Sequence, residues 1–172
     1  MRIYLIITFI LFFFLNPKTA WADVSVVTPS AQLVSPKKDI NNDLRPTRLE
    51  QFLNKHKSPL ADYSEDFVNY ADKYNLDWRL VPAISGVEST FAKRYPKDSF
   101  NAYGWANGKY KFSSWENSIE VVSRTLREKY YDKGATNINK IARRYAPPSN
   151  SWGWKVKYFM NKIDSVPVEF DL

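Results

Sequence analysis

The sequence has 172 residues, enough for one domain with a hydrophobic core, and a formal net charge of +7. It has no cysteine and a single histidine, His56, which excludes disulfides, thiol catalysis, cysteine metal sites, and triads or zinc sites built from several histidines. Any catalysis must therefore use carboxylates, tyrosines, hydroxyls or backbone dipoles, and nothing in the sequence indicates a metal ion or an organic cofactor.

The first 22 residues have the pattern of a secretory signal peptide. Arg2 gives a positive start, an apolar run follows over residues 3–15, and Ala20-Trp21-Ala22 matches the A-x-A cleavage pattern. The alternative is an uncleaved membrane anchor, which would need roughly 20 apolar residues, more than this run has. We therefore predict cleavage near Ala22 and an exported protein that is extracellular, in the cell wall or in the periplasm.

Residues 23–60 are predicted to form a linker or disordered leader, with at most a short helical turn over 48–56. Four prolines and scattered serine and asparagine interrupt any periodicity in this range. It is either a plain flexible leader or a basic segment that contacts the wall or a membrane surface. The folded domain is expected over residues 61–164, followed by a C-terminal tail over 165–172.

Two helices are predicted at the start of this domain, over residues 63–74 and 80–91. In the second, Ile84, Val87 and Phe91 recur at helical spacing and mark a side that faces the core. Glu88 follows Ile84 by four positions and so lies on nearly the same side. An acid in such surroundings is either hydrogen-bonded structure or a proton donor with a raised pKa.

The middle of the domain predicts the only β element. Asn107-Gly108 separates two aromatic-rich arms within residues 101–112, and both residues tolerate the positive φ angles of a tight hairpin turn. The fold class is therefore mainly α, with a helical lobe and one small β-hairpin flanking a substrate cleft. In this arrangement Glu88 lies on the floor of the cleft.

A capping box is predicted directly after the hairpin. Ser113 is the expected cap and Glu116 reaches back to it, opening a helix that ends before Gly134. This role accounts for Glu116 without catalysis. Two further helices are expected, one beginning after Thr136 and one after Ser151.

Aromatic residues make up 16% of the sequence, more than so small a core needs, so part of them should be exposed. Exposed aromatic rings beside carboxylates and amides suit sugar binding, because the CH face of a pyranose ring packs on an aromatic face. The dispersed positive charge fits an anionic polymer or surface and is too weak to indicate nucleic acid.

Four segments in this order resemble the lysozyme-like superfamily, and most of all the bacterial cell-wall glucosaminidases and their lytic transglycosylase relatives. The resemblance covers roughly residues 61–164 and rests on the segments 81–91, 101–105, 112–116 and 144–147. It implies a lysozyme-like α+β fold and Glu88 as the catalytic acid. It also implies that the substrate meets Ser89, Asn101, Tyr103, Trp105 and Tyr145, with Gly104 in the segment that lines the cleft. For Tyr145 a purely structural position in the core remains an equal alternative.

The sequence departs from some of these relatives because residues 101–112 contain no second acid. Asp98 is the nearest candidate, and a solvated loop charge is its simpler interpretation. A retaining mechanism therefore has no obvious protein nucleophile. Attack would come from a positioned water, or from the substrate's own N-acetyl or hydroxyl group, the latter giving an anhydro-sugar.

These features predict a monomeric exported glycosidase that cleaves the β-1,4-linked amino-sugar strands of peptidoglycan, of the glucosaminidase type. Lytic transglycosylase activity and a non-catalytic peptidoglycan-binding module on the same fold are the alternatives. The sequence does not distinguish which glycosidic bond would be cut.

Overall fold

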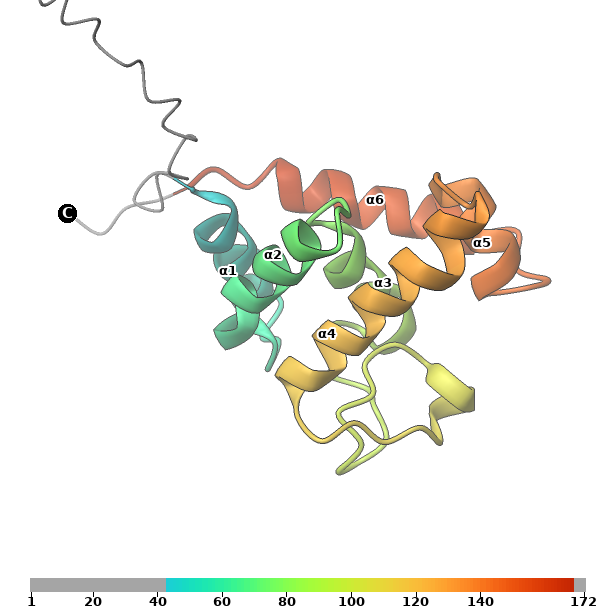
Figure 1. Ribbon diagram of the computed structural model, residues 1–172. Coiled ribbons are helices and arrows are strands. Elements are labelled where there is room, and N and C mark those ends of the chain that lie inside the picture. Colours follow the sequence, from blue (N-terminus) through green and yellow to red (C-terminus); the bar gives the residue numbers. More distant parts are fainter. Residues whose placement is uncertain (1–42, 169–172) are drawn as a thin grey trace, which may run out of the picture. The chain divides into compact units, whose positions relative to one another are not determined.

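The computed structural model describes residues 43–168, and the predicted signal peptide and most of the predicted leader lie outside them. Six α-helices make up half of the described part, and Figure 1 shows how they are arranged. They are α1 (Arg45–Lys55), α2 (Ser64–Lys73), α3 (Leu80–Ser89), α4 (Trp115–Thr125), α5 (Ile138–Tyr145) and α6 (Trp152–Asp164). None of the helices within residues 43–168 has the length and apolar character that crossing a membrane requires.

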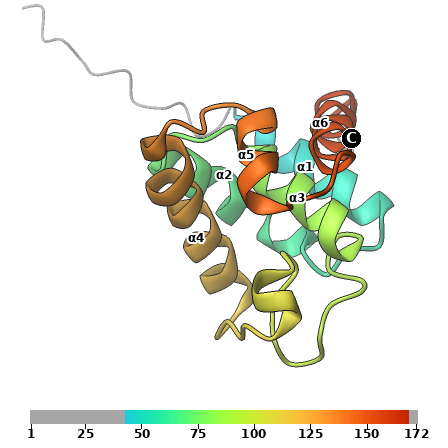
Figure 2. The same ribbon diagram turned by 90° about the vertical axis from the view of Figure 1, so that its right-hand side faces the viewer.

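Helix α3 is the central element. Eight of its residues are buried, so the helix is apolar all round rather than along one stripe as predicted: Leu80, Val81, Pro82, Ala83, Ile84, Ser85, Gly86 and Ser89. Helix α6 packs along it, and Figure 2 shows α3 surrounded by the other helices. A helix enclosed in this way holds its side chains in fixed positions, which matters for Glu88 at its end.

Helix α1 corrects the predicted linker. Its residues Leu49, Phe52 and Leu53 are buried in the core, and the helix packs against α2 and α6. Pro46 does not interrupt it, because Pro46 lies in the first turn, where the missing backbone N–H is not needed. The folded part thus includes residues of the range 23–60 from residue 43 onward, and residues 23–42 lie outside the described part.

The chain leaves α3 through an abrupt left-handed turn. Thr90, Phe91 and Ala92 have φ angles of 55°, 57° and 58°, a region that costs a residue with a side chain about 1–2 kcal/mol. The turn is held from both sides: the Ala92 N–H donates to the Ser89 hydroxyl, and the Ser58 hydroxyl donates to the Phe91 carbonyl. The next segment therefore folds back over the end of α3.

The predicted β-hairpin is wrong, because residues 43–168 contain no strand. Asn107 and Gly108 do have positive φ angles, 53° and 82°, but they end a short 3₁₀ turn, Trp105–Gly108, instead of joining two strands. The Asn101 side chain supplies the bonds that strand pairing would have made. Its amide nitrogen donates to the carbonyls of Trp105 and Tyr110, at 2.9 and 3.1 Å. Figures 1 and 2 show this segment as loops beside the helices.

The predicted capping box is displaced by one residue. Ser114, not Ser113, caps α4 and accepts from the Asn117 N–H at 3.0 Å, while the Asn117 side chain accepts from the Ser113 N–H at 3.4 Å. Glu116 instead accepts a hydrogen bond from the Tyr70 hydroxyl of α2 at 3.2 Å. Its role is structural, as expected, but through another contact. The helical path continues to a left-handed Gly134, where the predicted end is confirmed.

Candidate active site

Glu88 lies in the last turn of α3, half-buried, at the point where the folded-back segment approaches the helix. Its carboxylate has a partner on each side. The indole N–H of Trp152 donates to Oε1 at 2.6 Å. The backbone of Gly104 lies so close to Oε2 that an added Cβ would be 2.7 Å from this oxygen. Glu88 thus joins three parts of the fold: the end of α3, the start of α6 and the loop after residue 100.

Burial raises the pKa of Glu88 above its ordinary value, and the hydrogen bond from Trp152 acts in the opposite direction. Burial is the larger effect, because a charged carboxylate loses more hydration than one hydrogen bond returns. Glu88 therefore holds its proton to a higher pH than an exposed glutamate. A protonated carboxyl group that is still partly exposed can give its proton to a ligand.

Gly104 is required at its position for two reasons. Its φ angle is 71°, which favours glycine, and an added Cβ would lie 2.7 Å from Glu88 Oε2. Any side chain here would push the carboxylate away. The close approach of backbone to acid explains why glycine occurs in this segment.

The Gly104→Ala variant is expected to lose about 1–2 kcal/mol of stability from its left-handed backbone and about a hundredfold of activity from displacement of Glu88. Gly134→Ala is the matched control. Gly134 also has a left-handed φ of 80°, but no atom lies within 4 Å of its added Cβ. The control should lose similar stability in denaturant unfolding and keep its activity. Equal activity of the two variants would contradict the contact between Gly104 and Glu88.

Tyr145 at the end of α5 ties the loop to the helices. Its hydroxyl donates to the Tyr103 carbonyl at 2.8 Å and accepts from the indole N–H of Trp105 at 3.2 Å. Its ring stacks on Trp152, with 4.9 Å between the centroids and 23° between the planes. Burial of the hydroxyl raises the pKa of Tyr145, and the charge of nearby Glu88 raises it further. The phenol thus stays neutral beside the acid.

Ser89, Asn101 and Tyr103 are buried, and they lie behind the loop surface. The Ser89 hydroxyl lies 2.8 Å from the Ala102 carbonyl and 3.0 Å from that of Ser85, so it links α3 to the loop. The Asn101 amide oxygen accepts from the N–H groups of Tyr103 and Trp105, at 3.3 and 3.1 Å. The side-chain polar groups of Ser89 and Asn101 are thus occupied within the protein and hold the loop in place.

Trp105 is partly exposed, and its ring packs against Tyr110 and Phe112. Trp105 and Tyr145 are the predicted sugar-contacting residues that remain partly exposed. Asp98 is exposed, and it is not among the groups that shift the pKa of Glu88.

Trp152 is the site residue that the sequence did not reveal. The sequence places it only at the start of the helix expected after Ser151, and in the structure it is 3% exposed. Nothing in the local pattern indicates that its N–H reaches a carboxylate 64 positions earlier. The available signal is chemical: a buried indole N–H needs an acceptor.

Fold and site together define a helical domain with one half-buried acid between a central helix and a loop. No family model matches the sequence, and no curated protein matches it. Among the solved structures that match is autolysin E of S. aureus in complex with the muropeptide NAM-L-Ala-D-iGlu. The TM-score is 0.54 at 18% sequence identity, and the match covers 69% of this chain and 65% of that chain, a little under two thirds. The likeness supports, at the level of fold, the resemblance predicted from the sequence.

Proposed function

We propose that this protein is an exported peptidoglycan-cleaving glycosidase of the glucosaminidase type, with Glu88 as its general acid. The observation that carries the proposal is the half-buried Glu88, whose pKa is raised by burial and whose carboxylate lies between Trp152 and Gly104. The fold of the protein is similar to that of autolysin E in complex with a muropeptide, and this likeness supports peptidoglycan as the substrate. Export rests on the signal-peptide pattern of residues 1–22.

In the proposed reaction, Glu88 gives its proton to the glycosidic oxygen as the bond from that oxygen to the anomeric carbon breaks. The leaving sugar departs with a free hydroxyl group. A water molecule then bonds to the anomeric carbon, and its proton passes to the Glu88 carboxylate, which restores the acid. Glu88 serves both steps because it is the positioned carboxyl group at this site.

Lytic transglycosylase activity is the second candidate, favoured by a specific observation. Residues 101–112, which form the loop beside Glu88, contain no aspartate or glutamate. A protein nucleophile is therefore not at hand, and the substrate's own 6-hydroxyl can attack the anomeric carbon. The hydroxyl proton then passes to Glu88, and the product is a 1,6-anhydro-sugar.

Product analysis tests the proposal. Purified peptidoglycan is digested with the exported protein, and the soluble fragments are identified by mass spectrometry with and without borohydride reduction. Reducing N-acetylglucosamine ends are the expected result. Reducing N-acetylmuramic acid ends would mean that the enzyme cuts the other glycosidic bond of the strand. Anhydro-sugar ends would establish lytic transglycosylase activity instead. Binding to peptidoglycan without release of any fragment would contradict the proposed enzymatic activity and would favour a non-catalytic binding module.

The pH dependence of activity provides a separate prediction through Trp152. The acid must be protonated to act, so activity falls as the pH rises through the pKa of Glu88. The Trp152 hydrogen bond lowers this pKa, so its removal in Trp152→Phe should raise the pKa and move the alkaline limb of the pH–rate profile upward. Phenylalanine can still stack on Tyr145. We expect about a tenfold loss at the optimum from looser placement of the acid.

Trp154→Phe is the control for this variant, because Trp154 lies on the same helix and is 59% exposed. Its pH–rate profile should match that of the parent. A downward move of the alkaline limb in Trp152→Phe would contradict the role given to the indole N–H.

A further inference from the structure

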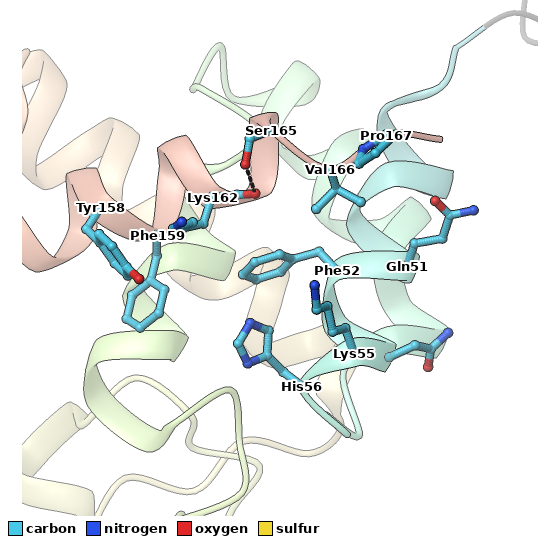
Figure 3. A pocket seen from close by; sticks show the side chains of 11 residues that line it. Gln51, Phe52, Lys55, His56, Tyr158, Phe159, Lys162, Ser165, Val166 and Pro167 are labelled. Carbon is cyan, nitrogen blue, oxygen red and sulfur yellow. Dashed lines mark hydrogen bonds between the residues drawn. The ribbon is translucent and has the colours of Figure 1, made fainter. Parts of the chain in front are cut away.

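A groove remote from Glu88 lies between α1 and α6, with a volume of about 760 Å³, within the usual range for ligand sites. Figure 3 shows the side chains that line it, with Phe52 between the two helices. We call it the α1–α6 groove. Its lining consists of Gln51, Phe52, Asn54, Lys55, His56, Tyr158, Phe159, Lys162, Ser165, Val166 and Pro167.

The charges of the α1–α6 groove have one sign. Lys55 lies on α1 and Lys162 on α6, and no aspartate or glutamate is among the lining residues. The nearest acid along α6 is Asp164, which is paired with Arg79 at 3.1 Å and Arg48 at 3.5 Å. The lysines of the groove are therefore available to an anionic ligand.

The apolar surface of the groove is aromatic. Phe52 packs on His56 at a centroid distance of 4.6 Å and edge-on to Phe91 at 5.3 Å, and Phe91 packs on Phe159 at 4.9 Å. Tyr158 stands at the rim and is 50% exposed. Phe52 is only 3% exposed, so the aromatic surface that a ligand can reach is that of Tyr158 and the partly exposed Phe159. A ligand for this groove needs a face that packs on these rings as well as a negative charge.

The groove is separate from the Glu88 site. Glu88 is not among the lining residues, and the residues of α6 that line the groove lie six to ten positions after Trp152, which contacts Glu88. At 1.5 Å per residue this separation is roughly 9 to 15 Å along the helix. A carboxylate bound by Lys162 would therefore not touch the acid.

We propose that the α1–α6 groove is a second binding site, which takes an acidic glycopeptide of the wall. Lys55 and Lys162 bind the carboxylates of the peptide part, and the aromatic rings pack against a sugar ring. The proposal rests on the proposed function, because it takes peptidoglycan as the polymer that the protein meets. A second contact of this kind holds the enzyme on an insoluble substrate while Glu88 acts on a different strand.

His56 offers a direct probe, because it is the only histidine in the sequence and its imidazole signal is unambiguous in a proton NMR spectrum. Burial lowers the pKa of His56, and the charges of Lys93 and Lys55 lower it further, with Lys162 on the opposite wall. A carboxylate bound between these groups must raise the pKa of His56, because its negative charge favours the protonated imidazole. Titration with N-acetylmuramyl-L-alanyl-D-isoglutamate should therefore raise the pKa of His56 by about half a unit or more.

Charge variants test the walls of the groove. The double variant Lys55→Gln/Lys162→Gln should bind this muropeptide about fivefold more weakly by calorimetry, since each exposed ion pair contributes little by itself. The control Lys97→Gln/Lys140→Gln removes two exposed lysines that do not line the groove, and it should bind as the parent does. All binding measurements use the Glu88→Gln background so that a chitotriose control is not cleaved; the muropeptide has a single sugar and no glycosidic bond for Glu88 to act on.

Three results would overturn the proposal: an unchanged pKa of His56 at millimolar muropeptide, equal affinity of the two double variants, or an equal shift of the His56 signal by neutral chitotriose. Equal binding of the dipeptide L-Ala-D-Glu would overturn the sugar contact and make the groove a site for acidic peptides. These outcomes are independent of the proposed function, which has its own test. If the proposed function is wrong, the parent protein releases no soluble fragments from peptidoglycan.

Discussion

The Glu88→Gln variant should lose about a thousandfold of its activity on peptidoglycan while remaining folded, because general acid catalysis contributes about 10²–10⁴-fold. The amide retains the shape of the side chain and an oxygen that can accept from Trp152. It has no acidic proton for the glycosidic oxygen. Release of soluble fragments measures the loss, and thermal unfolding should give a melting temperature close to that of the parent.

Glu128→Gln is the matched control for the acid. Glu128 is exposed and lies in the turn that extends α4, away from the contacts of Glu88. Its activity should equal that of the parent. If Glu88→Gln releases fragments as fast as Glu128→Gln does, Glu88 is not the acid.

The Asn101→Ala variant should have the largest effect on the loop. Asn101 is 1% exposed, and its side chain makes four hydrogen bonds to the backbone of residues 103–110. Alanine leaves these donors and acceptors without partners, which should cost about 2–4 kcal/mol. Since the loop carries Gly104 and the carbonyl that accepts from Tyr145, we also expect about a hundredfold loss of activity.

Amide hydrogen exchange locates this effect. The N–H groups of Tyr103 and Trp105 should exchange much faster in Asn101→Ala, while those of α3 keep their protection. Asn101→Asp keeps the two accepted bonds and loses the two donated ones, so it should fall between the parent and alanine. Asn161→Ala, on the exposed side of α6, should change neither loop exchange nor activity. Slow exchange in Asn101→Ala would contradict the bridging role.

Local patterns predicted the helices of this fold but not the path of the loop. Residues 63–74 and 80–91 were predicted as helices because their apolar residues recur at helical spacing, and α2 and α3 lie within those ranges. The segment around Asn107-Gly108 has the turn residues of a hairpin, and the positive φ angles confirm that part of the prediction. The strands are missing because the buried Asn101 side chain satisfies the backbone instead.

The composition of residues 23–60 led to the wrong prediction of a linker where α1 lies. Pro46 and the polar residues near it suggested a leader, although Leu49, Phe52 and Leu53 have the i, i+3, i+4 spacing of a helix that packs on a core. Within the site, Glu88 could be found because an acid among apolar residues is visible in one helix. The contact with Trp152 could not, because it depends on how α6 packs against α3.

The position of Glu88 along its helix has a further electrostatic consequence. The peptide dipoles of α3 add up along its axis, so the last turn, where Glu88 lies, carries partial negative charge from carbonyl groups. This field disfavours a second negative charge and favours the neutral carboxyl group. Water and salt screen this field, so it acts most strongly on a carboxyl group that is partly buried, as Glu88 is. An acid in the first turn of the same helix would meet the opposite field, so the C-terminal placement by itself selects for a proton donor.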